Sequence, residues 1–211
     1  MSNKSAQPPP DRARARDSFP ETEPSSRNQP PPSSASLRGI IDALLQGSLV
    51  ELFQAYGVAC APLPRDGRGE LERYPDLSAI IGFTSAPASR AARANGRLSL
   101  SMSPEIVETM QGDRAQPTRH ADWSRELVNQ LMGRLKNRLL PYGAKLQAGL
   151  PSSIGREALE AELARAGGRR VYRARTLRGE VIATLDGSLN EADLAYVGPT
   201  TDATEGELIL F

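Results

Sequence analysis

Four residues between positions 126 and 136 have side-chain types and a spacing that could act together on one helix. They are Glu126, Asn129, Gly133 and Lys136. At about 100° per residue, with Leu127 taken as zero, they fall at about 180–260° around the helix axis. The apolar residues fall at about 0–140°, and they are Leu127, Val128, Leu131, Met132, Leu135 and Leu139. The sequence therefore predicts a helix that is buried on one side and carries the four residues on the other.

Each of these residue types gives the outward side of the helix a different property. The Glu126 carboxylate can pair with a cation, and the Asn129 carboxamide offers a donor and an acceptor, which suits the orientation of a water molecule. Gly133 costs roughly 1 kcal/mol relative to alanine, and its missing Cβ lets another group approach the helix closely. The four residues describe a surface that could meet a second protein. They are equally what a solvated helix carries, and Gly133 could instead allow close packing of helix on sheet.

Composition limits the chemistry to carboxylates, amides, hydroxyls and lysines. Lys and Arg total 26 against 25 Asp and Glu, and this balance argues against a nucleic-acid binder. A single Cys (Cys60) and a single His (His120) exclude a disulfide framework and the usual His/Cys metal cages. No apolar run approaches the ~20 residues that span a bilayer, and the N-terminus lacks the apolar region of a secretory signal. We expect a cytoplasmic protein without membrane insertion.

Two long helices are expected to organise the domain. Apolar spacing predicts a first helix over residues 37–56, with Ser36 and Gly57 as its caps. The central helix, which carries the four residues, is predicted over residues 123–140 with Asp122 as its N-cap.

Short segments around the helices have the patterns of strands. In residues 96–102 apolar and polar residues alternate, which predicts a strand covering a core with one face, and Asn95-Gly96 supplies a turn before it. A polar loop that includes His120 is expected over residues 111–121. The other expected elements are strands over 58–63, 77–84 and 144–150, helices over 104–110 and 156–166, and a hairpin of 170–177 with 180–185. This order indicates an α/β (α+β) fold with long helices on a largely antiparallel sheet.

Both ends of the chain differ in composition from the middle. Residues 1–36 hold 8 of the 17 prolines and almost no large apolar side chains, so we expect a disordered tail there. The domain is predicted over residues 37–190. Residues 191–211 read as an acidic tail that ends in the apolar peptide 207–211, which either docks back as a strand or serves as a peptide for a partner.

The segment Glu-Leu-Val-Asn-Gln-Leu-Met-Gly-Arg-Leu-Lys over residues 126–136 resembles the signature helix of the CheX/CheC/FliY chemotaxis phosphatases. In CheX-type members that signature reads E-[LI]-x-N-x-[IL]-x-G-x-x-K. The strands before the helix and the segment 149–154 after it agree with the family, over roughly residues 37–189. CheC-type members carry two such motifs. The first helix here offers only Glu51-Leu52-Phe53-Gln54, with Gln in place of Asn, so the chain looks CheX-like.

The resemblance implies a CheX-like protein phosphatase that hydrolyses the phospho-aspartate of a CheY-like response regulator. Asn129 would hydrogen-bond the attacking water, and Glu126 would form a salt bridge to the regulator's active-site lysine. Gly133 would permit close contact, and Lys136 either meets an acidic surface of the regulator or is solvated. The chain itself would need no cofactor, because Mg²⁺ would be supplied by the regulator. The resemblance leaves a homodimer open.

Two other hypotheses remain from the sequence. The first is a non-catalytic adaptor of the same fold that binds a response regulator or a signalling complex through its tails. The second is an unrelated α+β domain whose helix matches by chance, which would bury the outward side of the helix under another element.

Overall fold

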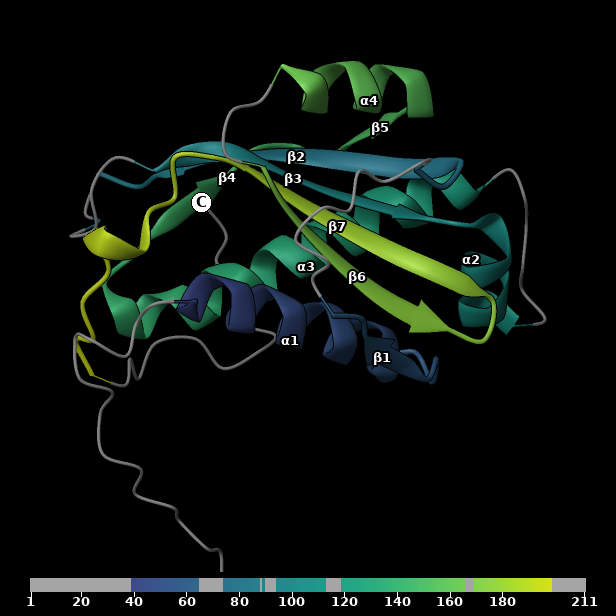
Figure 1. The fold of residues 1–211 in the computed structure, drawn as a ribbon, viewed down its shortest axis with the longest axis horizontal. Coiled ribbons are helices and arrows are strands. Elements are labelled where there is room, and N and C mark those ends of the chain that lie inside the picture. The colour runs from purple at the N-terminus through teal and green to yellow at the C-terminus, as the bar shows by residue number, and fades with distance from the viewer. Residues whose placement is uncertain are drawn as a thin grey trace, which may run out of the picture. The chain divides into compact units, whose positions relative to one another are not determined.

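The computed structural model describes residues 39–64, 74–87, 89, 94–112, 119–165 and 169–198. The predicted N-terminal tail over residues 1–36 and the apolar peptide 207–211 lie outside the described residues. Figure 1 shows a sheet with the helices α1 (Ile40–Ala55) and α3 (His120–Leu139) on one face and α4 (Arg156–Ala164) on the other. The helix α2 (Pro104–Gln111) follows the third strand.

The described residues form a sheet of seven strands, and every pairing among these strands is antiparallel. Its order is β1-β6-β7-β3-β2-β4, and β5 also pairs with β2. The strands are β1 (Cys60–Pro62), β2 (Leu77–Ser85), β3 (Asn95–Met102), β4 (Leu146–Ala148), β5 (Ser152–Ile154), β6 (Arg170–Thr176) and β7 (Gly179–Gly187). The prediction of long helices on a largely antiparallel sheet is confirmed, and so is the hairpin of β6 with β7.

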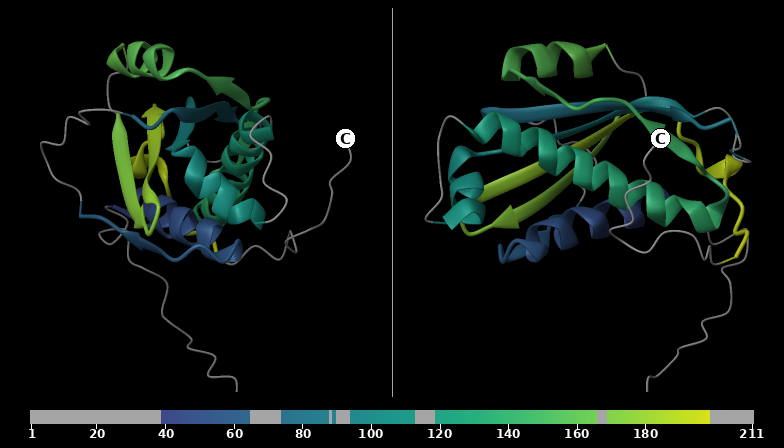
Figure 2. Two further views of the ribbon diagram at one scale, coloured as in Figure 1. Left: turned by 90° about the vertical axis from the view of Figure 1, so that its right-hand side faces the viewer. Right: turned by 180° about the vertical axis from the view of Figure 1, so that it is seen from behind.

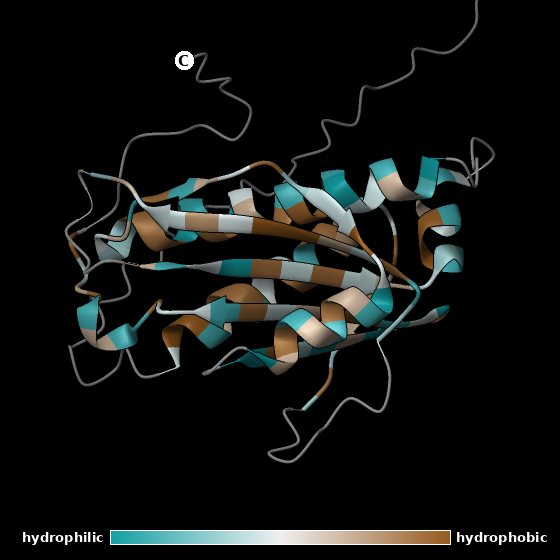
Figure 3. Ribbon diagram, turned by 90° about the horizontal axis from the view of Figure 1, so that it is seen from above, coloured by the Kyte–Doolittle hydropathy of each residue, from teal (hydrophilic) through white to brown (hydrophobic). Residues whose placement is uncertain are grey.

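The main core fills the space between the sheet and the two long helices. Leu45 and Leu49 of α1 and Leu131 and Leu135 of α3 are fully buried in one apolar cluster with Leu98 of β3. Figure 2 shows α1 and α3 side by side against the strands. The long strands carry both apolar and polar residues (Figure 3). In β3 they alternate, as expected for a strand that presents one face to this core, whereas β2 and β7 each contain a run of three apolar residues, 79–81 and 181–183.

The opposite face of the sheet is also covered, which the sequence did not indicate. Leu159 and Leu163 of α4 form a second apolar cluster with Tyr74 and Ile182. The predicted face of residues 96–102, with Leu98, Leu100 and Met102, lies in the main core, and Ser99 and Ser101 on the other face are buried as well, which the alternation did not indicate. The Ser101 hydroxyl satisfies part of its hydrogen bonding by accepting from the hydroxyl of Ser78 at 2.8 Å.

An ion-pair cluster adds to the attachment of α4. Arg97 of β3 donates to Asp186 of β7 (Nη2–Oδ2 2.9 Å) and pairs with Glu162 of α4. The hydrogen bonds to Glu162 and Asp186 raise the pKa of the Arg97 guanidinium above its ordinary value. One arginine therefore links the helix to two neighbouring strands.

Three predicted boundaries are wrong. Asn95-Gly96 is not a turn but the start of β3, because both residues pair with β2. Asp122 is not the N-cap of the central helix: the helix begins at His120, in the predicted loop, and its N-cap is Arg119. The N-cap of α1 is Gly39 in the left-handed conformation (φ 81°), while Ser36 lies outside the described residues.

The first residues of the predicted acidic tail pack on the domain. Gly39 N–H at the start of α1 donates to Glu191 Oε2 at 3.0 Å. The backbone N–H groups of Ala195 and Val197 donate to the carbonyls of Tyr142 and Pro141 at 3.2 and 2.7 Å. Residues 191–198 thus contact both the start of α1 and the turn after α3.

A substitution at Gly96 of β3 tests how closely the neighbouring strands β7 and β2 approach this residue. A Cβ at this position would lie 2.1 Å from the Asp186 carbonyl oxygen and 2.7 Å from the Phe83 ring. We expect Gly96→Ala to lower the free energy of unfolding by roughly 1–3 kcal/mol, the usual cost of overpacking. Chemical denaturation measures the change.

Gly82→Ala is the matched control, because a Cβ at Gly82 would meet its nearest atom at 3.9 Å. Its unfolding midpoint should be at least that of the wild type. Equal midpoints for the two variants would contradict the close approach at Gly96.

Candidate functional site

The helix α3 lies between β2 on one side and α1 on the other. Its buried side chains pack on the sheet, and they are His120, Ser124, Leu127, Val128, Leu131, Met132, Leu135 and Leu139. All six apolar residues of the predicted stripe are in this set, so the predicted rotation of the helix about its axis is confirmed. Asp122 in the first turn and Lys136 and Arg138 in the last turn complement the helix dipole.

The structure places the four candidate residues together on the outward side of α3. Glu126 and Asn129 are exposed, and Gly133 and Lys136 are partly exposed. Glu126 and Asn129 are one turn apart, as are Lys136 and Gly133, so the four form a single row that we call the α3 stripe. The functional roles of these residues stay predictions, but their placement on one accessible surface is a fact of the fold.

Asn129 and Gly133 leave an open area in the middle of the α3 stripe. Within the part of the chain that the structure describes, no hydrogen bond engages the Asn129 carboxamide. A Cβ added to Gly133 would meet no described atom within 4 Å. The hypothesis that Gly133 allows close packing of helix on sheet is therefore wrong, and the missing side chain leaves space on the outer surface.

Glu126 is held in place by neighbours that the sequence analysis did not select. Gln130 Nε2 donates to Glu126 Oε1 at 2.9 Å, one turn along the helix. The Gln130 amide also meets the Tyr56 hydroxyl, which lies 2.9 Å from Nε2 and 3.0 Å from Oε1. The spacing of Glu126 and Gln130 could have indicated the first contact, whereas Tyr56 comes from α1 and no local pattern links it to Glu126.

An aromatic pair borders the α3 stripe on its α1 side. The rings of Tyr56 and Trp123 pack edge to face, with centroids 5.6 Å apart and planes at 72°. Both side chains are only partly buried and pack against the main core. The contact therefore fixes the Tyr56 ring beside α3 while part of both rings stays accessible.

The helix α1 carries the incomplete second motif, residues 51–54. Glu51 of α1 forms an ion pair with Arg138 of α3 and lies 3.9 Å from Arg134 Nη1. The Glu51 carboxylate therefore joins the two helices, unlike Glu126. Glu51 and Gln54 are exposed and one turn apart, as are Glu126 and Asn129, but the Glu51 carboxylate is engaged by an arginine of α3 and Gln54 stands in place of Asn.

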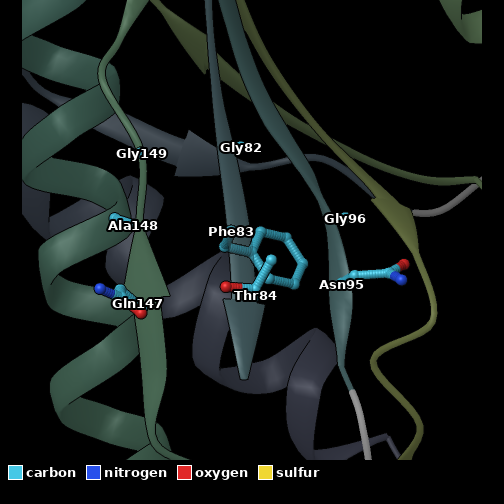
Figure 4. Close-up of a pocket in the computed structure, with 8 residues that line it drawn as sticks. All are labelled: Gly82, Phe83, Thr84, Asn95, Gly96, Gln147, Ala148 and Gly149. Atoms are coloured by element: carbon cyan, nitrogen blue, oxygen red, sulfur yellow. The ribbon is translucent and has the colours of Figure 1, made fainter. Parts of the chain in front are cut away.

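A shallow pocket of about 500 Å³ lies away from the α3 stripe, and Figure 4 shows its lining. Its residues come from β2, β3, β4 and the residue after β4: Gly82, Phe83, Thr84, Asn95, Gly96, Gln147, Ala148 and Gly149. None of them is titratable, so they offer hydrogen bonds but no acid–base group.

Other candidate chemistry is not assembled in the described residues. The described part of the chain holds no group of three or more His, Cys, Asp and Glu that could bind a metal. Burial raises the pKa of the Cys60 thiol, which opposes the thiolate that a nucleophile requires. Among the described helices, none has the length and apolar character needed to cross a bilayer.

The sequence matches no family model and no curated protein. Solved structures do match. CheX from Vibrio vulnificus is 15% identical, with a TM-score of 0.55 over 71% of this chain and 99% of that chain. A CheC-like superfamily protein from Shewanella sp. PV-4 is 16% identical, with a TM-score of 0.54 over 70% of this chain and 97% of that chain. A putative chemotaxis protein from Desulfovibrio vulgaris Hildenborough is 18% identical, with a TM-score of 0.53 over 71% and 97%.

At these identities the similarity is one of fold. The matched proteins are covered almost completely, so the likeness extends over their whole domain. The arrangement predicted from the resemblance of residues 126–136 is confirmed: the chain has a CheX/CheC-like fold.

Proposed function

We propose that this protein is a phosphatase that hydrolyses the phospho-aspartate of a CheY-like response regulator, with Glu126 and Asn129 as its active residues. One observation carries the proposal. A carboxylate and an unengaged carboxamide stand one turn apart on the solvent side of a helix in a CheX/CheC-like fold.

The reaction needs few groups from the phosphatase. Water attacks the phosphorus of an acyl phosphate, and the bond between phosphorus and the aspartyl oxygen breaks. The products are the free carboxylate and inorganic phosphate, which takes up the proton of the water. Because the transition state is loose, rate depends mainly on holding the water in line and on stabilising charge. The regulator would supply the phospho-aspartate, Mg²⁺ and a lysine.

Asn129 is suited to holding that water. Its carboxamide oxygen can accept a hydrogen bond from the water, and its NH₂ group can donate to a phosphoryl oxygen. A neutral amide does not remove a proton, so its contribution is position. The described residues leave both ends of the amide unused, so Asn129 needs no internal rearrangement before it enters a partner's site.

Glu126 and Gly133 are suited to the docking step. A carboxylate one turn from Asn129 can pair with the regulator's lysine and so fix the register of the helix on its partner. The space above Gly133 admits the partner's surface close to the helix backbone. Lys136 would lie at the end of the contact with the regulator. Because CheY-like regulators act in the cytoplasm, the proposal implies that this protein is cytoplasmic.

Asn129→Ala should lower the acceleration of regulator dephosphorylation by at least about tenfold, because the water loses its orienting group. Each CheY-like regulator of the source genome is phosphorylated with acetyl phosphate, and phosphate release is followed with and without the protein. The far-UV circular dichroism should stay unchanged, because the side chain is exposed.

Asn137→Ala is the matched control, because Asn137 is also an exposed asparagine of α3 and lies about 12 Å further along the axis. It should retain full activity. Wild-type activity in Asn129→Ala would end the assignment. Binding without acceleration by the wild type would instead identify a non-catalytic adaptor.

Two substitutions at Gly133 distinguish the stability of the helix from its binding to a partner. Gly133→Ala should raise the free energy of unfolding by up to about 1 kcal/mol, because helix propensity improves and the added Cβ meets no atom of the described residues within 4 Å. Gly133→Leu should weaken binding to a beryllofluoride-loaded regulator although its helix is no less stable. Both are measured, one by denaturation and the other by calorimetric titration. Unchanged affinity in Gly133→Leu would show that no partner approaches this position.

A further inference from the structure

The Glu126 carboxylate is fixed by a hydrogen-bonded chain that begins on another helix. Tyr56 stands at the C-cap of α1, where its backbone N–H donates to the Phe53 carbonyl at 3.1 Å. Its hydroxyl meets the Gln130 amide, and Gln130 Nε2 reaches Glu126 Oε1 at 2.9 Å. The exposed Glu126 side chain is thus linked to the rigid packing between α1 and α3.

The Tyr56 hydroxyl contacts both ends of the Gln130 amide. The hydroxyl can donate to Oε1 at 3.0 Å and accept from Nε2 at 2.9 Å, while Nε2 also donates to Glu126 Oε1. In the reverse orientation two acceptors, Gln130 Oε1 and Glu126 Oε1, would face each other and repel. The carboxylate therefore selects the orientation in which Nε2 faces it, and the Tyr56 hydroxyl holds the amide in place beside Glu126.

The bond from Gln130 uses one of the two carboxylate oxygens of Glu126. Within the described residues no hydrogen bond engages Glu126 Oε2. One oxygen accepts from Gln130, and the other is available to a cation because the Glu126 side chain is exposed. A side chain that is already ordered loses less conformational entropy when it forms an ion pair.

We propose that Tyr56 and Gln130 are positioning residues that pre-orient Glu126 for the cation of its partner. The inference rests on the proposed function and names the part of the site that sets affinity. Tyr56 and Gln130 act on association through Glu126, whereas Asn129 acts on the hydrolytic step. The partner's surface consequently extends from the α3 stripe onto the end of α1, beside the Tyr56 and Trp123 rings.

Trp123 provides the measurement. It is the chain's single tryptophan, and its ring packs against Tyr56 at 5.6 Å. Intrinsic fluorescence in a titration with a beryllofluoride-loaded, tryptophan-free regulator variant therefore reports binding at this surface. Steady-state dephosphorylation of the same regulator gives KM and kcat separately.

Tyr56→Phe keeps the ring and removes the hydroxyl, and Gln130→Leu keeps the size of the side chain and removes the amide. Each should raise Kd and KM about twofold to tenfold, the usual effect of one hydrogen bond, and leave kcat within about twofold. In a Glu126→Gln background the same substitutions should have no further effect on Kd, because Glu126 is the residue through which they act.

Tyr142→Phe is the matched control, because Tyr142 also forms an edge-to-face ring pair, with Tyr196 at 5.8 Å, but lies beyond the end of α3. It should bind like the wild type. If Tyr56→Phe and Gln130→Leu lower the unfolding midpoint and leave Kd unchanged, the hydrogen bonds of Tyr56 and Gln130 only join the two helices and the inference fails. Equal effects in the wild-type and Glu126→Gln backgrounds would also overturn it.

The outcomes keep the two proposals distinct. If the wild type accelerates dephosphorylation and Asn129→Ala does not, while both positioning variants bind normally, the proposed function stands and this inference falls. If the wild type neither binds nor dephosphorylates any of the regulators, both fall.

Discussion

The burial of one side of α3 fixes the direction in which every other residue of that helix points. Leu127, Leu131 and Leu135 are fully buried against the sheet, and a shift of the pattern by a single residue would rotate the helix by about 100°. Such a rotation would carry Glu126 toward α1 or the core. The exposure of Glu126 and Asn129 is therefore a consequence of apolar packing on the opposite side of the helix, and the site needs no separate structural support to face solvent.

Packing on the sheet alone leaves the charged side chains free to move, and α1 supplies the remaining restraint. Glu51 joins α1 to Arg138 near one end of the contact, and Tyr56 reaches Gln130 near the other. The Tyr56–Gln130 link lies on the side of α3 next to the stripe, so it orients Glu126 without covering the stripe itself. The result is a surface on a packed helix, with a carboxylate that is held by Gln130 and an amide that no described residue engages.

Much of this arrangement was accessible from the sequence because it depends on local period. The rotation of α3, the long strands and the hairpin of β6 with β7 all follow from the spacing of apolar residues. What failed depends on contacts between distant segments. Ser99 and Ser101 look like solvent-facing residues, yet α4, about sixty residues later, covers that face. Tyr56 and Gln130 are 74 residues apart, so no pattern in either helix could show that they meet.

Gly133 shows why this surface is better explained by association than by stability. A glycine within a helix costs roughly 1 kcal/mol relative to alanine, and an alanine here would contact no described atom within 4 Å. Asn129, one turn away, likewise leaves a polar side chain without a hydrogen-bond partner among the residues that the structure describes. Neither residue stabilises the isolated domain. Each can make a favourable contribution only when another molecule lies against the helix. A held carboxylate beside them can provide the register for that molecule, because an ordered charge distinguishes one docked arrangement from its neighbours.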